Sequence, residues 1–480
     1  MASADTSMQP PAAAGAGEQS RLARGVLNDV DIAAATLADM APAMSFFFAF
    51  ATIVATAGIA APLTVITATI AIALLGNTLS QFSRSRPSTG SFVTYVGGAF
   101  GGYAAVVTAV VLCAGYIIAV ASVVTISGGF AETILKHYLS ITIPWQAISA
   151  FLTLGALALI VTGAKPSTKV AAILFTFQVL LLLVVGIALL IQHSGYINGQ
   201  PFNPSNLHRG FSGLSLGFPL AIYLFVGWEN SAALAEEHRD PRKGVTRAVF
   251  SSILVVGALY VFLSYATVVG FDNNAAALTA AQVPFVTAAG GVASGLMFIA
   301  YLAGFASICS CLIAATNSQA RILFNSGREG LLPSVTAKLT MQRRTPWVAF
   351  SVYLALALGL SYVFGWNTDP VTFFGEIATL GTILIALTYL AANIALPVYY
   401  HRYENARFST FKHLLLPLLG AAAIGYPLYE LVKPGQPAPF NKYPLIAAGV
   451  VVAALVWAAI AYGRDRTLGE RVGSIVADAD

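Results

Sequence analysis

Glu229 is the residue in this sequence best placed for proton chemistry, because it interrupts an apolar stretch. Residues 223–230 read YLFVGWEN, and a dense charged cluster follows at residues 236–243. A carboxylate in hydrocarbon costs about 2.5 to 3.5 kcal/mol on insertion scales, so a membrane-buried glutamate is a functional candidate. Burial favours the neutral form of a carboxyl group, which can then exchange a proton. We expect Glu229 either to exchange a proton or to hydrogen-bond interrupted helix backbone.

Two apolar stretches contain residues that interrupt a helix. Pro42 lacks a backbone donor and clashes with the preceding turn, and Gly227 allows the backbone to leave helical geometry. Breaks at membrane depth are tolerated where the backbone is buried or lines a watery cavity, and the freed groups can bind a polar ligand. An ordinary proline kink is the alternative at Pro42. The candidate ligand-binding residues are Ala41, Pro42, Ala43, Met44, Ser45, Phe225, Val226, Gly227 and Trp228.

The composition indicates a polytopic membrane protein. Of the 480 residues, 57% are hydrophobic and 9% are charged, whereas soluble domains have about 25% charged residues. A membrane span needs about 20 mostly apolar residues. The sequence predicts an all-α protein with twelve such spans, at residues 37–57, 62–82, 103–128, 145–162, 170–192, 214–234, 246–271, 292–324, 347–364, 371–399, 414–431 and 445–462.

The charge distribution supports this topology. With the N-terminus inside, 21 of the 25 Lys and Arg residues face the cytoplasm, and only Lys136, Arg209, Lys433 and Lys442 face outward. Cytoplasmic loops carry an excess of Lys and Arg. We therefore expect a multi-pass protein of the cell membrane with both termini in the cytoplasm. The net charge of +5 is an orientation signal rather than evidence of a nucleic-acid partner.

Short loops indicate one membrane domain without an inserted soluble domain. The sequence predicts a disordered cytoplasmic tail at residues 1–30, a ten-helix core at 31–400, two further helices at 401–463 and a cytoplasmic tail at 464–480. Residues 1–30 show no pattern of a cleaved signal peptide. Cys309 and Cys311 have Cys-x-Cys spacing, but we interpret them as small packing residues because zinc normally requires four ligands. We expect no cofactor and no metal site.

Three motifs in sequence order resemble those of amino acid-polyamine-organocation (APC) permeases. They are residues 86–95 (RPSTGSFVTY), residues 225–229 (FVGWE) with 236–237 (EE) and 240–242 (DPR), and residues 321–324 (RILF) with 327–333 (GREGLLP). The resemblance covers about residues 37–397. It implies a leucine-transporter-like 5+5 inverted repeat followed by two C-terminal helices, and transport by alternating access. The two interrupted stretches lie five expected helices apart, as this arrangement requires.

The resemblance also assigns roles to individual residues. Glu229 matches a glutamate that couples a proton or stabilises the unwound region, and Tyr223 matches an aromatic gate over the substrate. Tyr116 on the third expected span, and Phe373, Phe374 and Glu376 on the tenth, could line the pocket. Simple helix packing is the alternative for each aromatic residue.

Two departures from the family pattern affect these roles. The family's glycine-rich G-S-G at the first break is replaced by Ala41-Pro42-Ala43. This replacement weakens the expected contact with a substrate carboxylate. Residues 170–192 lack the lysine that replaces a sodium ion in some proton-dependent relatives, and Ser307 and Ser310 could instead help to bind sodium.

The sequence thus predicts a secondary transporter of amino acids, driven by proton symport or by exchange, with sodium possible. A carrier of polyamines or other organic amines is the alternative, because an amine without a carboxylate needs acidic partners such as Glu229. A membrane enzyme is disfavoured, since GLSLG at residues 213–217 opens a membrane helix and all six histidines lie outside the expected spans. A sensor would normally carry an output domain. The substrate, the coupling ion, the direction of flux and the oligomeric state are left open.

Overall fold

The computed structural model describes residues 22–208, 210–472 and 477. In this part of the chain the regular structure is helical, and the extended contacts are limited to one isolated bridge. The α-helices are α2 (Asp29–Met40), α3 (Pro42–Ala57), α4 (Ala61–Ser85), α5 (Phe92–Phe100), α6 (Gly102–Ile134), α7 (Trp145–Val161), α8 (Ala164–Gln192), α9 (Phe211–Tyr223), α10 (Pro241–Val269), α11 (Ala275–Ala280), α12 (Pro284–Val292), α13 (Ser294–Arg328), α14 (Trp347–Gly365), α15 (Pro370–Tyr403), α16 (Leu416–Val432), α17 (Tyr443–Arg464) and α18 (Leu468–Arg471). The 3-10 segment η6 covers Asn230–Glu237.

Nine stretches of the described chain are long and apolar enough to cross a membrane. One of them, Asp29–Ser85, contains α2, α3 and α4, and the shorter apolar helices α7 and α9 add to the nine. These helices confirm the expected all-α polytopic membrane protein. Most helix ends lie within a few residues of the predicted span ends.

The first expected span is divided, as the sequence predicted. Ala41 has a left-handed backbone (φ 47°) between α2 and α3, a conformation that few residues other than glycine adopt. Pro42 is the first residue of α3, where its missing N–H is not needed. The chain therefore ends one helix at Met40 and starts another at once.

The sixth expected span, residues 214–234, is also interrupted at Gly227, as the sequence predicted. Helix α9 ends at Tyr223, turns follow, and η6 begins at Asn230. Gly227 has a φ of +106°, which only glycine adopts without strain. The interruption is thus longer than the sequence indicated, and the second half of the span is a 3-10 helix.

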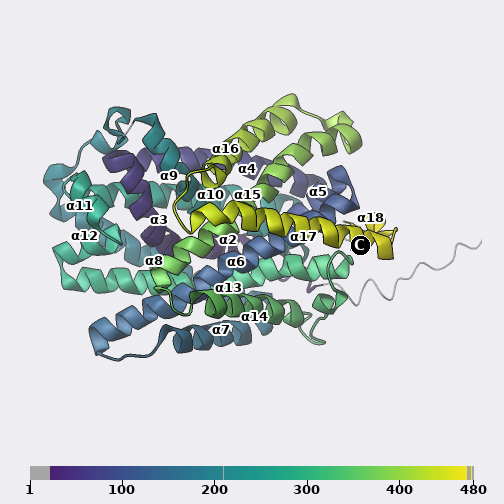
Figure 1. Ribbon diagram of the computed structural model, residues 1–480, viewed down its shortest axis with the longest axis horizontal. Helices are drawn as coiled ribbons and strands as arrows, with labels where there is room; N and C mark the ends of the chain where they lie inside the picture. Colours follow the sequence, from purple (N-terminus) through teal and green to yellow (C-terminus); the bar gives the residue numbers. More distant parts are fainter. Residues whose placement is uncertain (1–21, 209, 473–476, 478–480) are drawn as a thin grey trace, which may run out of the picture.

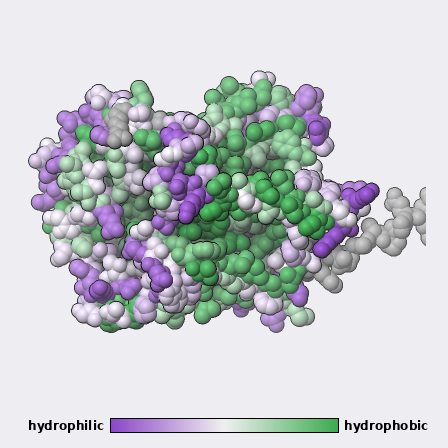
Figure 2. Space-filling view, viewed as in Figure 1, coloured by the Kyte–Doolittle hydropathy of each residue, from purple (hydrophilic) through white to green (hydrophobic). Residues whose placement is uncertain are grey.

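The long helices run roughly side by side along the long axis of the molecule, with α11 and α12 at one end and α18 at the other (Figure 1). Helix α6 packs against α15, α7, α13 and α14, and α13 also packs against α8. Hydrophobic residues gather on the surface over α16 and α17 (Figure 2). Exposed side chains on outer helices, such as Phe151, Val363 and Leu445, are large and apolar. Such a surface suits lipid rather than water.

Described residues within both predicted terminal tails contact the helical part of the protein. Leu22 and Leu27 are buried, and Leu27 forms a bridge with His238: Leu27 N–H donates to Glu237 O at 3.0 Å, and Arg239 N–H donates to Leu27 O at 3.2 Å. Near the other end, Ala477 N–H donates to Pro87 O at 2.9 Å. Residues 1–21 lie outside the described part of the chain.

Candidate functional site

The two interrupted spans meet inside the protein. A Cβ atom on Gly227 would lie 3.0 Å from the carbonyl carbon of Asp39 and 3.1 Å from its Cγ. No side chain fits at this distance without a shift, so glycine is required by both its φ angle and its space. The end of α2 and the turn after α9 are therefore in direct contact.

Side chains of the protein already bind the backbone groups freed at the first break. Ala43 N–H donates to Gln178 Oε1 at 3.3 Å, and Met44 N–H donates to Ser307 Oγ at 3.0 Å. Gln178 Nε2 donates to Ser310 Oγ at 3.1 Å. Gln178 lies on α8 and is fully buried. The start of α3, which the sequence predicted to bind a ligand, is thus occupied by side chains of α8 and α13.

Glu229 lies at the second break and is fully buried. Its Oε1 accepts a hydrogen bond from the Tyr116 hydroxyl at 2.7 Å, and its Oε2 accepts one from Gly227 N–H at 3.1 Å. The carboxylate therefore satisfies a donor of the interrupted backbone and connects it to α6. Trp228 packs between Phe92 and Tyr389, with ring centroids 6.4 and 5.6 Å away.

Asp39 is a second buried carboxylate at the same place, and sequence reasoning missed it. It lies in the last turn of α2, and both Ser318 Oγ, at 2.9 Å, and Asn230 Nδ2 donate to its Oδ2. The available signal was an acidic residue three positions before Pro42, inside an expected span. Asp39 and Glu229 thus place one buried carboxylate at each of the two breaks.

A cavity with an empty volume of about 380 Å³ lies beside the breaks. Asp39 lines it, together with residues of α3, α6, α9 and α13, whereas Glu229 does not. The lining residues are Asp39, Met44, Ser45, Ala119, Val120, Val123, Tyr223, Val226, Cys311, Ala315 and Gln319. Most of this wall is apolar, and its single charged side chain is acidic.

The predicted site residues divide into three groups. Met44, Ser45, Tyr223 and Val226 line the cavity. Ala41, Pro42, Ala43 and Gly227 form the breaks, and Tyr116, Phe225 and Trp228 are fully buried without lining it. Phe373 packs against Gly365, where a Cβ would lie 2.9 Å from its ring, and Glu376 is partly exposed.

A second hollow shares one aromatic lining residue with the cavity. This hollow has an empty volume of about 360 Å³ and is lined by residues that include Phe48, Pro219, Tyr223 and Phe374. The ring centroids of Tyr223 and Phe374 are 6.2 Å apart, and those of Phe48 and Phe374 are 5.1 Å apart. Tyr223 lines both spaces, so it forms part of the wall between them.

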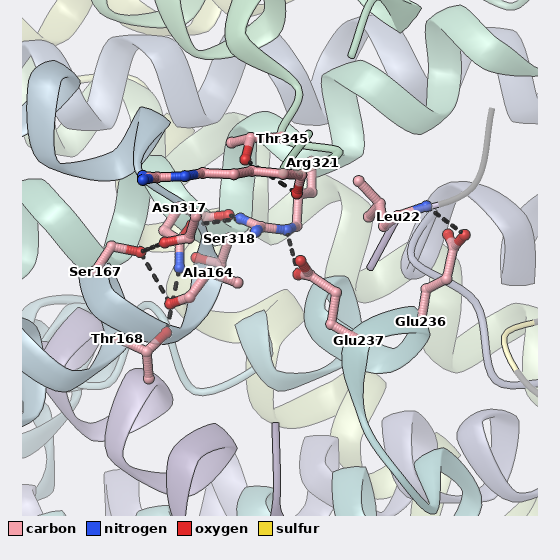
Figure 3. Close-up of polar contacts among 12 residues, drawn as sticks. Leu22, Ala164, Ser167, Thr168, Glu236, Glu237, Asn317, Ser318, Arg321 and Thr345 are labelled. Atoms are coloured by element: carbon pink, nitrogen blue, oxygen red, sulfur yellow. Dashed lines mark hydrogen bonds and ion pairs between the residues drawn. The ribbon is translucent and has the colours of Figure 1, made fainter. Parts of the chain in front are cut away.

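Buried ion pairs lie beyond the cavity in the other direction along α13. Gln319 lines the cavity, and two residues later Arg321 Nε lies 2.7 Å from Glu237 Oε2, with side-chain exposures of 0% and 4%. Arg328 and Glu236 form a second buried pair at 2.9 Å. Figure 3 shows Arg321 directed at Glu237, and Leu22 N–H donating to Glu236 at 2.9 Å. These pairs connect α13, η6 and the segment before α2.

The described residues contain no group of three or more His, Cys, Asp or Glu side chains that could hold a metal ion. The three cysteines are unpaired, and Cys113 and Cys311 are buried. Cys311 lines the cavity and donates to Asp39 O at 3.4 Å. Cys311 is thus in contact with the last turn of α2.

The chain is similar in sequence to several proteins that are named as permeases or transporters. The chain is 25% identical over 312 residues to the branched-chain amino acid permease BcaP of Bacillus subtilis (strain 168), covering 61% of this chain and 65% of that protein. It is 24% identical over 397 residues to a methylthioribose transporter of the same organism, covering 78% and 81%. It is 26% identical over 266 residues to the vacuolar cationic amino acid transporter 2 of Arabidopsis thaliana, covering 54% and 39%.

The match to the first of these relatives thus spans about two thirds of that protein's length. The profile of the amino acid permease family matches residues 27–456, which include both helix breaks and the buried ion pairs. The chain therefore belongs to the amino acid permease family.

Proposed function

We propose that this protein is a secondary active transporter that moves amino acids across the cell membrane by alternating access. The observation that carries this proposal is a cavity lined by Tyr223, which packs against Phe374, and by Gln319, which lies two residues before the buried Arg321–Glu237 pair. A transporter must close one end of its site while the other opens. Tyr223 with Phe374 would form the outer gate, and Arg321 with Glu237 the inner gate.

The proposed architecture has twelve spans, with the first ten in a 5+5 inverted repeat. The Asp29–Ser85 stretch provides two spans, and α7 and α9 complete the set. The breaks at Ala41 and Gly227 then fall in the first and sixth spans, where discontinuous helices of such repeats form binding sites. The Lys and Arg distribution supports cytoplasmic termini.

An amino acid with a small apolar side chain fits this cavity best. Ala119, Val120 and Val123 on α6 and Ala315 on α13 provide apolar surface. The permease from Bacillus subtilis is named for branched-chain amino acids, which carry such side chains. The related methylthioribose transporter is a reason to include other small molecules in a transport screen.

Proton coupling through Glu229 is the coupling mode that we propose. The two serines expected to bind sodium are engaged, since Ser307 accepts the Met44 N–H and Ser310 accepts the Gln178 amide. Glu229 is buried between Tyr116 and the interrupted backbone, so its protonation would alter the contact between α6 and the sixth span.

Uptake by reconstituted liposomes tests this proposal. Labelled amino acids, amines and a small sugar derivative would be offered with and without an inward proton gradient, in sodium and in sodium-free buffer. Uptake of apolar amino acids that requires the gradient in the wild type, and loses this requirement in Glu229→Gln, supports the proposal. If uptake depends on the gradient equally in the wild type and in Glu229→Gln, Glu229 has a structural role. If the wild type takes up none of the compounds, the proposal of transport is contradicted.

A further inference from the structure

We infer that Asp39 binds the cationic amine of the transported molecule, and that a carboxylate on that molecule is not required for binding. This inference rests on the proposed transport function and deepens it, because it specifies which group of the substrate the site recognises.

One carboxylate oxygen of Asp39, Oδ1, accepts no hydrogen bond from the described residues. Ser318 and Asn230 both donate to Oδ2. An ionised carboxylate has about four lone-pair sites on its two oxygens, so the acceptor capacity of Asp39 is only partly used. Because Asp39 lines the cavity, an ammonium group there could reach the remaining oxygen.

The charge balance of the cavity favours a cation. No Lys, Arg or His is among the residues that line it, and Asp39 is the acidic one. A buried charge is costly unless it is paired and hydrogen-bonded. Neutral donors from Ser318 and Asn230 satisfy one oxygen, and a protonated amine would supply the counter-charge.

A substrate carboxylate has no comparable partner here. Helix N-termini bind anions through their free N–H groups, but at the start of α3 the N–H groups of Ala43 and Met44 donate to Gln178 and Ser307. At the second break, Gly227 N–H donates to Glu229. The groups expected to recognise a carboxylate are thus engaged within the protein, so the amine provides the charged contact.

The cavity also limits the rest of the molecule. Apart from Asp39, its lining consists of apolar and uncharged polar side chains. Val120, Val123 and Ala315 present apolar surface opposite the break. The favoured ligand is a primary amine on a small apolar body, with or without a carboxylate.

A set of three matched compounds tests the inference on the purified full-length protein. Leucine carries amine and carboxylate, isoamylamine carries only the amine, and 4-methylpentanoate carries only the carboxylate. Binding would be measured by calorimetry, and folding by size-exclusion chromatography and thermal unfolding. We expect leucine and isoamylamine to bind and 4-methylpentanoate not to bind. Equal binding of 4-methylpentanoate and leucine would overturn the inference without any variant.

The variants are Asp39→Asn, Asp39→Glu and, as the matched control on the same helix, Asp31→Asn. A hydrogen bond to a charged group contributes about 1.5 to 3 kcal/mol, so Asp39→Asn should weaken amine binding by about 10- to 150-fold. Asp39→Glu keeps the charge and should retain part of the affinity. Asp31 accepts the Asn28 N–H far from the cavity lining, so Asp31→Asn should bind like the wild type.

Wild-type affinity in a folded Asp39→Asn protein would disprove the inference. If Asp39→Asn does not fold, the inference is still tested by the binding of the three matched compounds to the wild type and by the amine affinity of Asp39→Glu. The same compounds in the liposome assay separate the two proposals: binding through Asp39 without uptake by wild type would contradict transport, whereas uptake that is unaffected by Asp39→Asn would contradict only the role of Asp39.

Discussion

The Tyr116 hydroxyl donates a hydrogen bond to Glu229 Oε1 at 2.7 Å and so joins α6 to the interrupted sixth span. Tyr116→Phe removes this donor and leaves a fully buried carboxylate with one fewer partner. We expect the free energy of unfolding to fall by about 1 to 3 kcal/mol, the cost of an unsatisfied buried polar group. Denaturant titration in detergent measures this loss, and unchanged stability would show that another donor replaces Tyr116.

Removing the charge of Glu237 should open the inner end of the cavity. Glu237→Gln leaves the Arg321 guanidinium buried without its ion-pair partner, and breaking such a pair costs about 3 to 5 kcal/mol. Cys311 lines the cavity, so its reaction rate with a thiol reagent reports access, in a background where Cys113 and Cys309 are serine. We expect faster labelling in the variant.

The control for this labelling experiment is Arg407→Gln. Arg407 pairs with Glu404 at 3.3 Å, but its side chain is 77% exposed, and exposed pairs contribute about 0 to 1 kcal/mol. This variant should label like the parent protein. Equal labelling of Cys311 in Glu237→Gln and the parent would show that the inner ion pairs do not limit access.

Removing the outer aromatic layer should speed release of bound substrate. Tyr223 lines both the cavity and the second hollow, and Phe374 packs against it from the second hollow. Phe374→Ala would therefore remove part of the packing that holds Tyr223 between the two spaces. We expect a faster dissociation rate, measured by filter binding of a labelled substrate. Phe151→Ala on the exposed face of α7 is the control, and identical rates for the two variants would argue against a gate.

Sodium should not affect transport, because Gln178 bridges the start of α3 and Ser310. Wild-type uptake should be the same when choline replaces sodium. Gln178→Ala leaves Ala43 N–H without this acceptor, and a stability loss of about 1 to 3 kcal/mol should follow. Uptake that falls in sodium-free buffer would contradict the proposed coupling to protons without sodium.

Gly227 should not tolerate any side chain. In Gly227→Ala the residue must keep a left-handed backbone, which costs about 1 to 2 kcal/mol, and its Cβ would press on Asp39. We expect lower thermal stability and loss of transport. Gly425→Ala in α16 is the matched control, since a Cβ there meets nothing within 4 Å. Equal thermal stability of the two variants would show that the backbone at Gly227 can rearrange.

Much of the fold could be predicted from the sequence because lipid imposes a simple pattern. Long apolar runs separated by short charged loops marked the helices, and the nine candidate stretches follow them. Pro42 marked the first break because its ring cannot continue a helix. Gly227 gave only the position of the second break, since a glycine does not reveal how many residues leave the helix or that η6 is 3-10.

The site was less predictable because its contacts join distant segments. Asp39 and Asn230 are 191 positions apart, and Ala43 and Gln178 are 135 apart. No local pattern indicates that a glutamine in the middle of an apolar helix will bind the start of another helix. The sequence therefore predicted free backbone groups at the first break, whereas packing had supplied them with partners.

The bridge between Leu27 and the end of η6 has a mechanical consequence. Two backbone hydrogen bonds connect Leu27 to Glu237 and Arg239, and Asp29 starts α2 two residues later. Because the connection is through the main chain, it is independent of side-chain identity. The first half of the first span and the last part of the sixth are therefore connected through the main chain. If the inner end opens, both segments must move together unless both hydrogen bonds break.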